Sequence, residues 1–73
     1  MANDSNTGVK DINYDLISVI YHTTEATLRY NDYIRDALEV GDQELAQFLT
    51  ETQNAAKTTA QKAQEHLAKR LAK

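Results

Sequence analysis

The sequence predicts an all-α protein: an antiparallel two-helix hairpin that dimerises into a four-helix bundle. Three observations lead to this fold class. The 73-residue chain has no Pro and only two Gly, so it lacks the frequent turns of a sandwich or barrel. Apolar residues recur at spacings of three and four through two long segments. One break, Val40-Gly41-Asp42, separates these segments.

The first helix is expected from about 13 to 40, within a hairpin at 11–73 that follows a flexible polar tail at 1–10. Asp11 or Asn13 can cap it, because a short oxygen-bearing side chain accepts from the first-turn N–H groups. Its main seam is Leu16, Ile20, Thr23, Thr27, Tyr30, Ile34 and Ala37. A second stripe lies beside the seam: Tyr14, Ile17, Tyr21, Thr24 and Leu28. The apolar face is therefore wider than one neighbouring helix can cover.

The break and the second helix follow from local chemistry. Gly41 can adopt the left-handed conformation that ends a helix, and Asp42 is a good N-cap for the next one. The second helix is expected over about 43–71, antiparallel to the first because the turn is short. Its expected seam is Leu45, Leu49, Thr52, Ala56, Thr59, Ala63, His66 or Leu67, and Arg70 or Leu71, flanked by Phe48, Ala55 and Ala60. Small side chains in the middle of this helix allow the first helix to approach closely.

A hairpin of this size needs a partner. Chains under about 70–80 residues rarely hold a sufficient core without disulfides or a metal, and this chain has no Cys. The wide apolar face of the first helix (Leu16, Ile17, Ile20, Tyr21 and Leu28) has no second neighbour within one chain. We therefore expect a homodimer or a larger even oligomer. All four tyrosines lie in the first helix and suit a partly wet interface with another copy or with a protein partner.

Charge and hydropathy narrow the partners further. The net charge is −3, and no apolar run reaches the roughly 18 residues of a membrane span. The start also lacks the apolar region of a secretory signal, so we expect a cytoplasmic protein with no membrane partner. Five basic residues lie in the second half: Lys57, Lys62, Lys69, Arg70 and Lys73. We interpret them as cations that complement the helix dipole, and a nucleic-acid contact is the weaker alternative.

Charged and aromatic residues of both segments form a pattern typical of a known family. Glu25 stands in the middle of the first helix, and a Tyr follows about one turn later. The sequence Gly-Asp-x-Glu-Leu-Ala-x-Phe spans the turn and the start of the second helix, and Glu51 follows it. Over residues 14–70 the chain resembles the ferritin-like and rubrerythrin-like helical proteins. It is similar to one half of such a fold, like the short ferritin-like hairpins that dimerise.

The resemblance implies a site for iron or another divalent metal, with Glu25 and Glu51 as ligands. The family's Glu-x-x-His is incomplete here, because Asn54 stands three residues after Glu51 and an amide binds iron less well than imidazole. His22 precedes Glu25 by three residues and shares its face. Residues that face each other across the hairpin have numbers that sum to about 82, so Glu25 and Glu51 differ by roughly 9 Å of helix rise. A dimer can instead bring Glu25 and His22 together with their symmetry mates.

Other interpretations of these residues need no ligand. Glu25 lies opposite Lys57 and can form an interhelical ion pair, His22 can be a partly buried histidine, and Glu51 can be a solvated side chain. No Gly-rich phosphate loop and no His-Glu-x-x-His occurs. We therefore expect a non-enzymatic interaction or assembly protein without a cofactor. A ferritin-like protein that binds metal at its dimer interface is the alternative.

Overall fold

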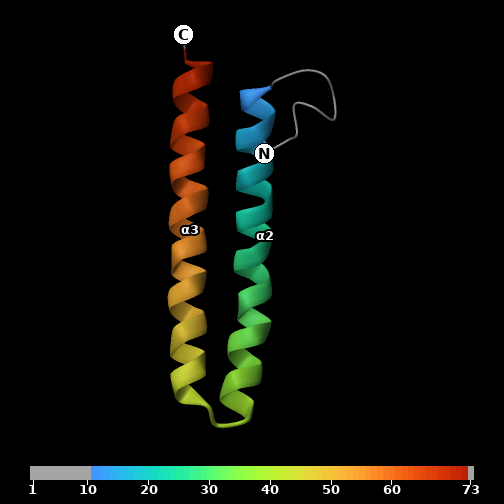
Figure 1. Cartoon of the computed structure of the whole chain (residues 1–73), viewed down its shortest axis with the longest axis vertical. Coiled ribbons are helices and arrows are strands. Elements are labelled where there is room, and N and C mark those ends of the chain that lie inside the picture. The colour runs from blue at the N-terminus through green and yellow to red at the C-terminus, as the bar shows by residue number, and fades with distance from the viewer. Residues whose placement is uncertain (1–10, 73) are drawn as a thin grey trace.

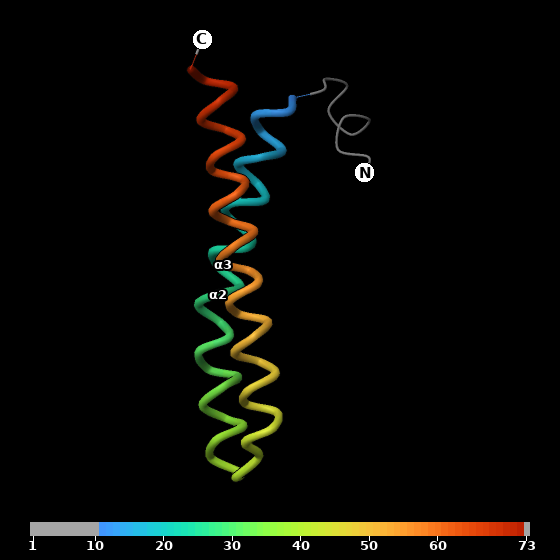
Figure 2. Tube along the Cα trace, turned by 90° about the vertical axis from the view of Figure 1, so that its left-hand side faces the viewer, coloured from blue at the N-terminus to red at the C-terminus, as the bar shows by residue number. Residues whose placement is uncertain are grey.

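The computed structural model describes residues 11–72, which form two α-helices packed side by side in opposite directions (Figure 1). Helix α2 spans Ile12–Glu39 and helix α3 spans Gln43–Leu71. The all-helical hairpin that the sequence predicts is confirmed, with α2 starting and ending one residue earlier than expected. The tail expected at 1–10 lies outside the described residues. Seen from the side, the two helices cross at a shallow angle (Figure 2), as helices with a heptad-like seam do.

Both helices begin at a capping aspartate. The Asp11 Oδ1 atom accepts a hydrogen bond from the Tyr14 N–H at 3.0 Å, and the Asp42 Oδ1 atom accepts one from the Leu45 N–H at 3.0 Å. Each side chain satisfies a first-turn donor that has no partner within its helix. Of the two caps expected for the first helix, the structure selects Asp11.

Gly41 makes the turn between the helices possible. Its φ angle is +79°, and its N–H donates to the Leu38 carbonyl at 3.0 Å. The N–H of Asp42 donates to the Ala37 carbonyl at 2.9 Å. These two bonds form a Schellman motif, in which the residue after the C-cap must adopt a left-handed conformation that glycine tolerates best. The same short segment therefore ends α2, starts α3 and makes the helices antiparallel.

The interhelical seam matches the sequence prediction on α2 and shifts on α3. All seven expected α2 positions are partly or fully buried. On α3 the seam is Ala46, Leu49, Gln53, Ala56, Ala60, Ala63 and Leu67. Leu45 and Thr59, which were expected in the seam, are exposed, and Ala60, expected at its flank, is buried. The prediction was wrong here because it took the register of the seam from the bulkier Leu45. In the structure, alanines make the close contact with α2.

The core of the single hairpin is thin. The buried apolar residues are four alanines, Ala37, Ala46, Ala60 and Ala63, and within residues 11–72 no large side chain is fully buried. Alanines allow close approach of the two backbones, but each removes little apolar surface from water. Since hydrophobic stabilisation scales with that area, at about 25 cal/mol per Å², this interface alone contributes little.

Candidate functional site

A stripe of exposed apolar side chains follows α2 on a face turned away from the interhelical seam. We call Tyr14, Ile17, Tyr21, Thr24 and Leu28 the α2 stripe. Its four large members are 59%, 52%, 61% and 64% exposed, in chain order. All but Tyr14 line an open hollow of about 530 Å³, together with Ile20 and Glu25. The second stripe that the sequence predicts is therefore present as an uncovered surface of the hairpin.

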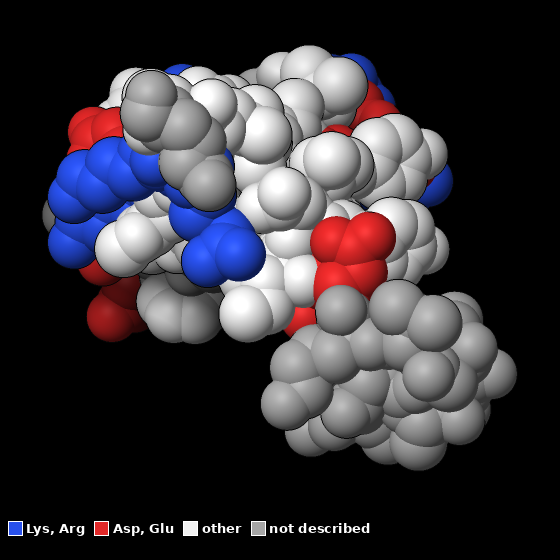
Figure 3. Space-filling model, turned by 90° about the horizontal axis from the view of Figure 1, so that it is seen from above, with Lys and Arg blue, Asp and Glu red and all other residues white. Residues whose placement is uncertain are grey.

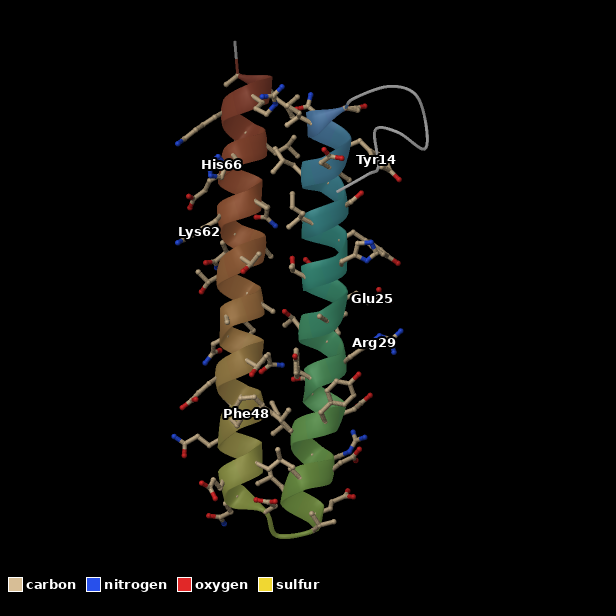
Figure 4. All side chains as sticks on the ribbon, in the orientation of Figure 1. Tyr14, Glu25, Arg29, Phe48, Lys62 and His66 are labelled. Atoms are coloured by element: carbon tan, nitrogen blue, oxygen red, sulfur yellow. The ribbon has the colours of Figure 1, made fainter. Side chains whose placement is uncertain are left out.

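Glu25 lies at the edge of this hollow and pairs along its own helix. Its Oε2 atom is 3.3 Å from the Nη2 atom of Arg29, and both side chains project away from α3 (Figure 4). The expected ion pair between Glu25 and Lys57 is wrong, because the carboxylate meets the cation one turn further along α2 instead. Such an exposed pair at i,i+4 contributes about 0.3–0.5 kcal/mol.

The other two predicted ligands, His22 and Glu51, are exposed and have contacts of their own. His22 is exposed, not partly buried as one interpretation had it, and its ring meets the Tyr21 ring edge to face at 5.3 Å. Glu51 is exposed on α3, where its Oε2 atom accepts from Gln47 Nε2 at 3.4 Å. Within residues 11–72, no three His, Asp or Glu side chains form a group that could hold a metal ion. A metal centre built from the predicted ligands would need side chains from a second copy.

A buried amide links the two helices near their middle. Gln53, only 8% exposed, donates through Nε2 to the Thr27 carbonyl and to Asn31 Oδ1, both at 2.8 Å. These partners agree with the expectation that residues facing each other across the hairpin have numbers that sum to about 82. Sequence reasoning missed Gln53, since a polar residue among alanines looks like a surface position. Buried polar groups of this kind fix the register of packed helices.

Gln53→Ala is expected to lower the free energy of unfolding by about 1–3 kcal/mol, because two partly buried hydrogen bonds between the helices are lost. Urea denaturation at one fixed protein concentration measures this change. The matched control is Gln47→Ala, which removes an exposed amide whose partner is the exposed Glu51. We expect that control to change stability by less than about 0.5 kcal/mol. Equal losses in the two variants would contradict the register role of Gln53.

The terminal end of the hairpin is held by a second polar link. Lys69 and Arg70 occupy the last turn of α3, where basic side chains gather in the view from above (Figure 3). The Arg70 Nε atom donates to Asn13 Oδ1 in the first turn of α2 at 2.8 Å. Arg70 therefore links the end of α3 to the start of α2. Cations in the last turn of a helix also complement the helix dipole.

Comparison of the chain with protein-family models, with curated proteins and with solved structures finds no match. The ferritin-like resemblance therefore stays a prediction. Within residues 11–72, no helix combines the length and the apolarity that crossing a membrane requires.

Proposed function

We propose that this chain is a non-enzymatic assembly module that binds a second copy of itself through the α2 stripe and forms a four-helix bundle. The observation that carries the proposal is the contrast in burial. Within residues 11–72 the hairpin buries four alanines and Gln53, while Ile17, Tyr21 and Leu28 are more than half exposed. Fully burying a large apolar side chain stabilises by about 1.5–3 kcal/mol. Pairing of two stripes would supply several such contributions, which a lone hairpin lacks.

The chemistry of the hollow supports assembly rather than catalysis. Its lining is mostly apolar, and its one carboxylate, Glu25, is already paired with Arg29. An enzyme site needs groups that converge on a substrate, and an open helix face presents its side chains outward. An apolar stripe whose members, two tyrosines among them, recur at spacings of three and four is instead typical of a surface that a second helix covers.

Sedimentation velocity over a concentration series tests the proposal. We expect a dimer or larger even oligomer for the unmodified chain, and at least tenfold weaker association for Leu28→Gln, because each dimer loses two buried leucines. Leu71→Gln is the matched control: Leu71 is also 64% exposed but lies at the end of α3. We expect it to associate normally. A well-folded monomer at every concentration, or equal weakening by both variants, would contradict the proposal.

A metal site at the same interface is the second candidate function, and one observation favours it. Glu25 lines the hollow, so two copies of its carboxylate would approach a paired interface, with His22 three residues away along α2. A native mass spectrum of protein from iron-supplemented cells reports subunit count and metal together. Stoichiometric metal that Glu25→Ala removes would favour metal binding. An even oligomer without metal would favour the assembly module.

A further inference from the structure

The α2 stripe does not run the length of the hairpin. It begins at Tyr14 and ends at Leu28, and the next positions at the same spacing, Asn31 and Arg35, are polar and exposed. The apolar surface therefore belongs to the half of α2 that lies beside the C-terminal half of α3 (Figure 1). On that face the half of α2 near the turn offers the polar Asn31 and Arg35, and then Leu38, which is 54% exposed, at its end.

We propose that two hairpins pair through antiparallel α2 helices with the two-fold axis at Tyr21, an inference that rests on the proposed self-association. In an antiparallel pair, residues at equal distances on either side of the axis face each other. An axis at Tyr21 sets Tyr14 against Leu28 of the partner subunit and Ile17 against Glu25 of the partner subunit. Tyr14, Tyr21 and Leu28 then meet members of the partner's stripe, and Ile17 lies one position away from Thr24 of the partner subunit. An axis near the middle of α2 would instead place Tyr14 against a polar residue such as Arg35.

Charge favours the antiparallel orientation over the parallel one. Parallel, in-register helices would place Glu25 beside its own copy and would also align the two helix dipoles. Each of these effects brings like charges together. The antiparallel pair places Glu25 near Ile17 of the partner subunit. The two Glu25 carboxylates are then separated along the axis by about eight residues, or roughly 12 Å. The dipoles are also opposed.

The area available fits a second copy. The four large members of the stripe are each more than half exposed, and at roughly 100 Å² or more each they offer on the order of 400 Å². That is about half of the ~800 Å² per partner in a standard interface, and the α2 side chains that flank the stripe, such as Ile20 and Glu25, add to it. The assembly is staggered, because only the terminal halves overlap. The two turns project at opposite ends, and Phe48, 60% exposed on α3 near the turn, stays outside the pair.

Single cysteines test this geometry, because the chain has no Cys of its own. Tyr21→Cys places two thiols on the axis, close enough for a disulfide between subunits. Leu28→Cys places the two thiols about 14 residues of rise apart, or roughly 21 Å, which is too far. Under oxidised glutathione we expect most Tyr21→Cys protein to double its mass under non-reducing conditions, and little Leu28→Cys protein to do so. The double variant Tyr14→Cys/Leu28→Cys keeps Tyr21 and should cross-link as well.

Each other outcome overturns a stated part of the inference. Efficient cross-linking of Leu28→Cys alone would establish parallel pairing and refute the antiparallel arrangement. No cross-link at Tyr21 or in the double variant, with a dimer in sedimentation, would move the interface elsewhere and leave self-association intact. A monomer in sedimentation, with no cross-link, would refute both the pairing and the proposed function.

Discussion

Ile20→Asp is expected to unfold the protein at room temperature. Ile20 lies in the α2 seam that faces α3, and it also lines the hollow of the proposed interface. Ile20 is half-buried, so its loss costs part of the about 2–5 kcal/mol of a fully buried large side chain, and desolvating a carboxylate adds to that cost. A core of this size rarely supplies more than about 3–5 kcal/mol. The single change therefore removes most of the stability available to the hairpin.

Circular dichroism at 222 nm, followed through thermal melting, measures this loss. Val19→Asp is the matched control, because it places the same charge one residue earlier, on a side chain that is 40% exposed. We expect Val19→Asp to keep its helical signal and to lose less than about 1 kcal/mol. If Ile20→Asp melts with the same midpoint as Val19→Asp, the seam does not carry the hairpin's stability.

The local features of the fold could be predicted from the sequence because each depends on neighbouring residues. Asp11, Gly41 and Asp42 act through hydrogen bonds and dihedral angles within about four positions of themselves. The α2 seam could also be predicted, because its isoleucines and leucine mark one face clearly. In both cases the side chain that gives the signal also makes the interaction.

The α3 seam could not be placed correctly for the opposite reason. Its contacts come from alanines, whose small apolar side chains give a weak periodic signal, and from Gln53, whose polarity suggests a surface position. What makes Gln53 a core residue is the Thr27 carbonyl and the Asn31 side chain of the other helix. Neither of these partners can be found from the spacing of residues along α3, because both belong to α2. Contacts with α2 therefore decide the register of the α3 seam, which helix propensity and the spacing of apolar residues do not indicate.

The candidate site divides in the same way. The α2 stripe could be predicted from the spacing of its residues along the sequence. The exposed fractions of its side chains show that a single hairpin leaves it uncovered. The partner of Glu25 was not predicted. Counting residues from the turn shows which residues lie opposite each other across the hairpin, but not which cation a flexible carboxylate pairs with. Arg29, one turn away on the same helix, is the cation it pairs with.

Ala60→Leu is expected to lower the free energy of unfolding by about 1–3 kcal/mol, because a larger side chain must push α3 away from α2. Ala60 is only 8% exposed in the seam, where small residues allow the helices to approach closely. Any displacement there would also strain the bonds from Gln53 to α2 two turns earlier. Urea denaturation measures the change, at the concentration used for the unmodified chain.

Thr59→Leu separates this explanation from a general intolerance of leucine in α3. Thr59 is exposed, and Leu has a higher helix propensity than Thr, so we expect no loss and a gain of up to about 0.5 kcal/mol. The pair of variants compares the register observed in the structure with the one that the leucines of α3 indicate. A larger loss for Thr59→Leu than for Ala60→Leu would place Thr59 in the seam. The opposite order would show that the alanines set the distance between the helices.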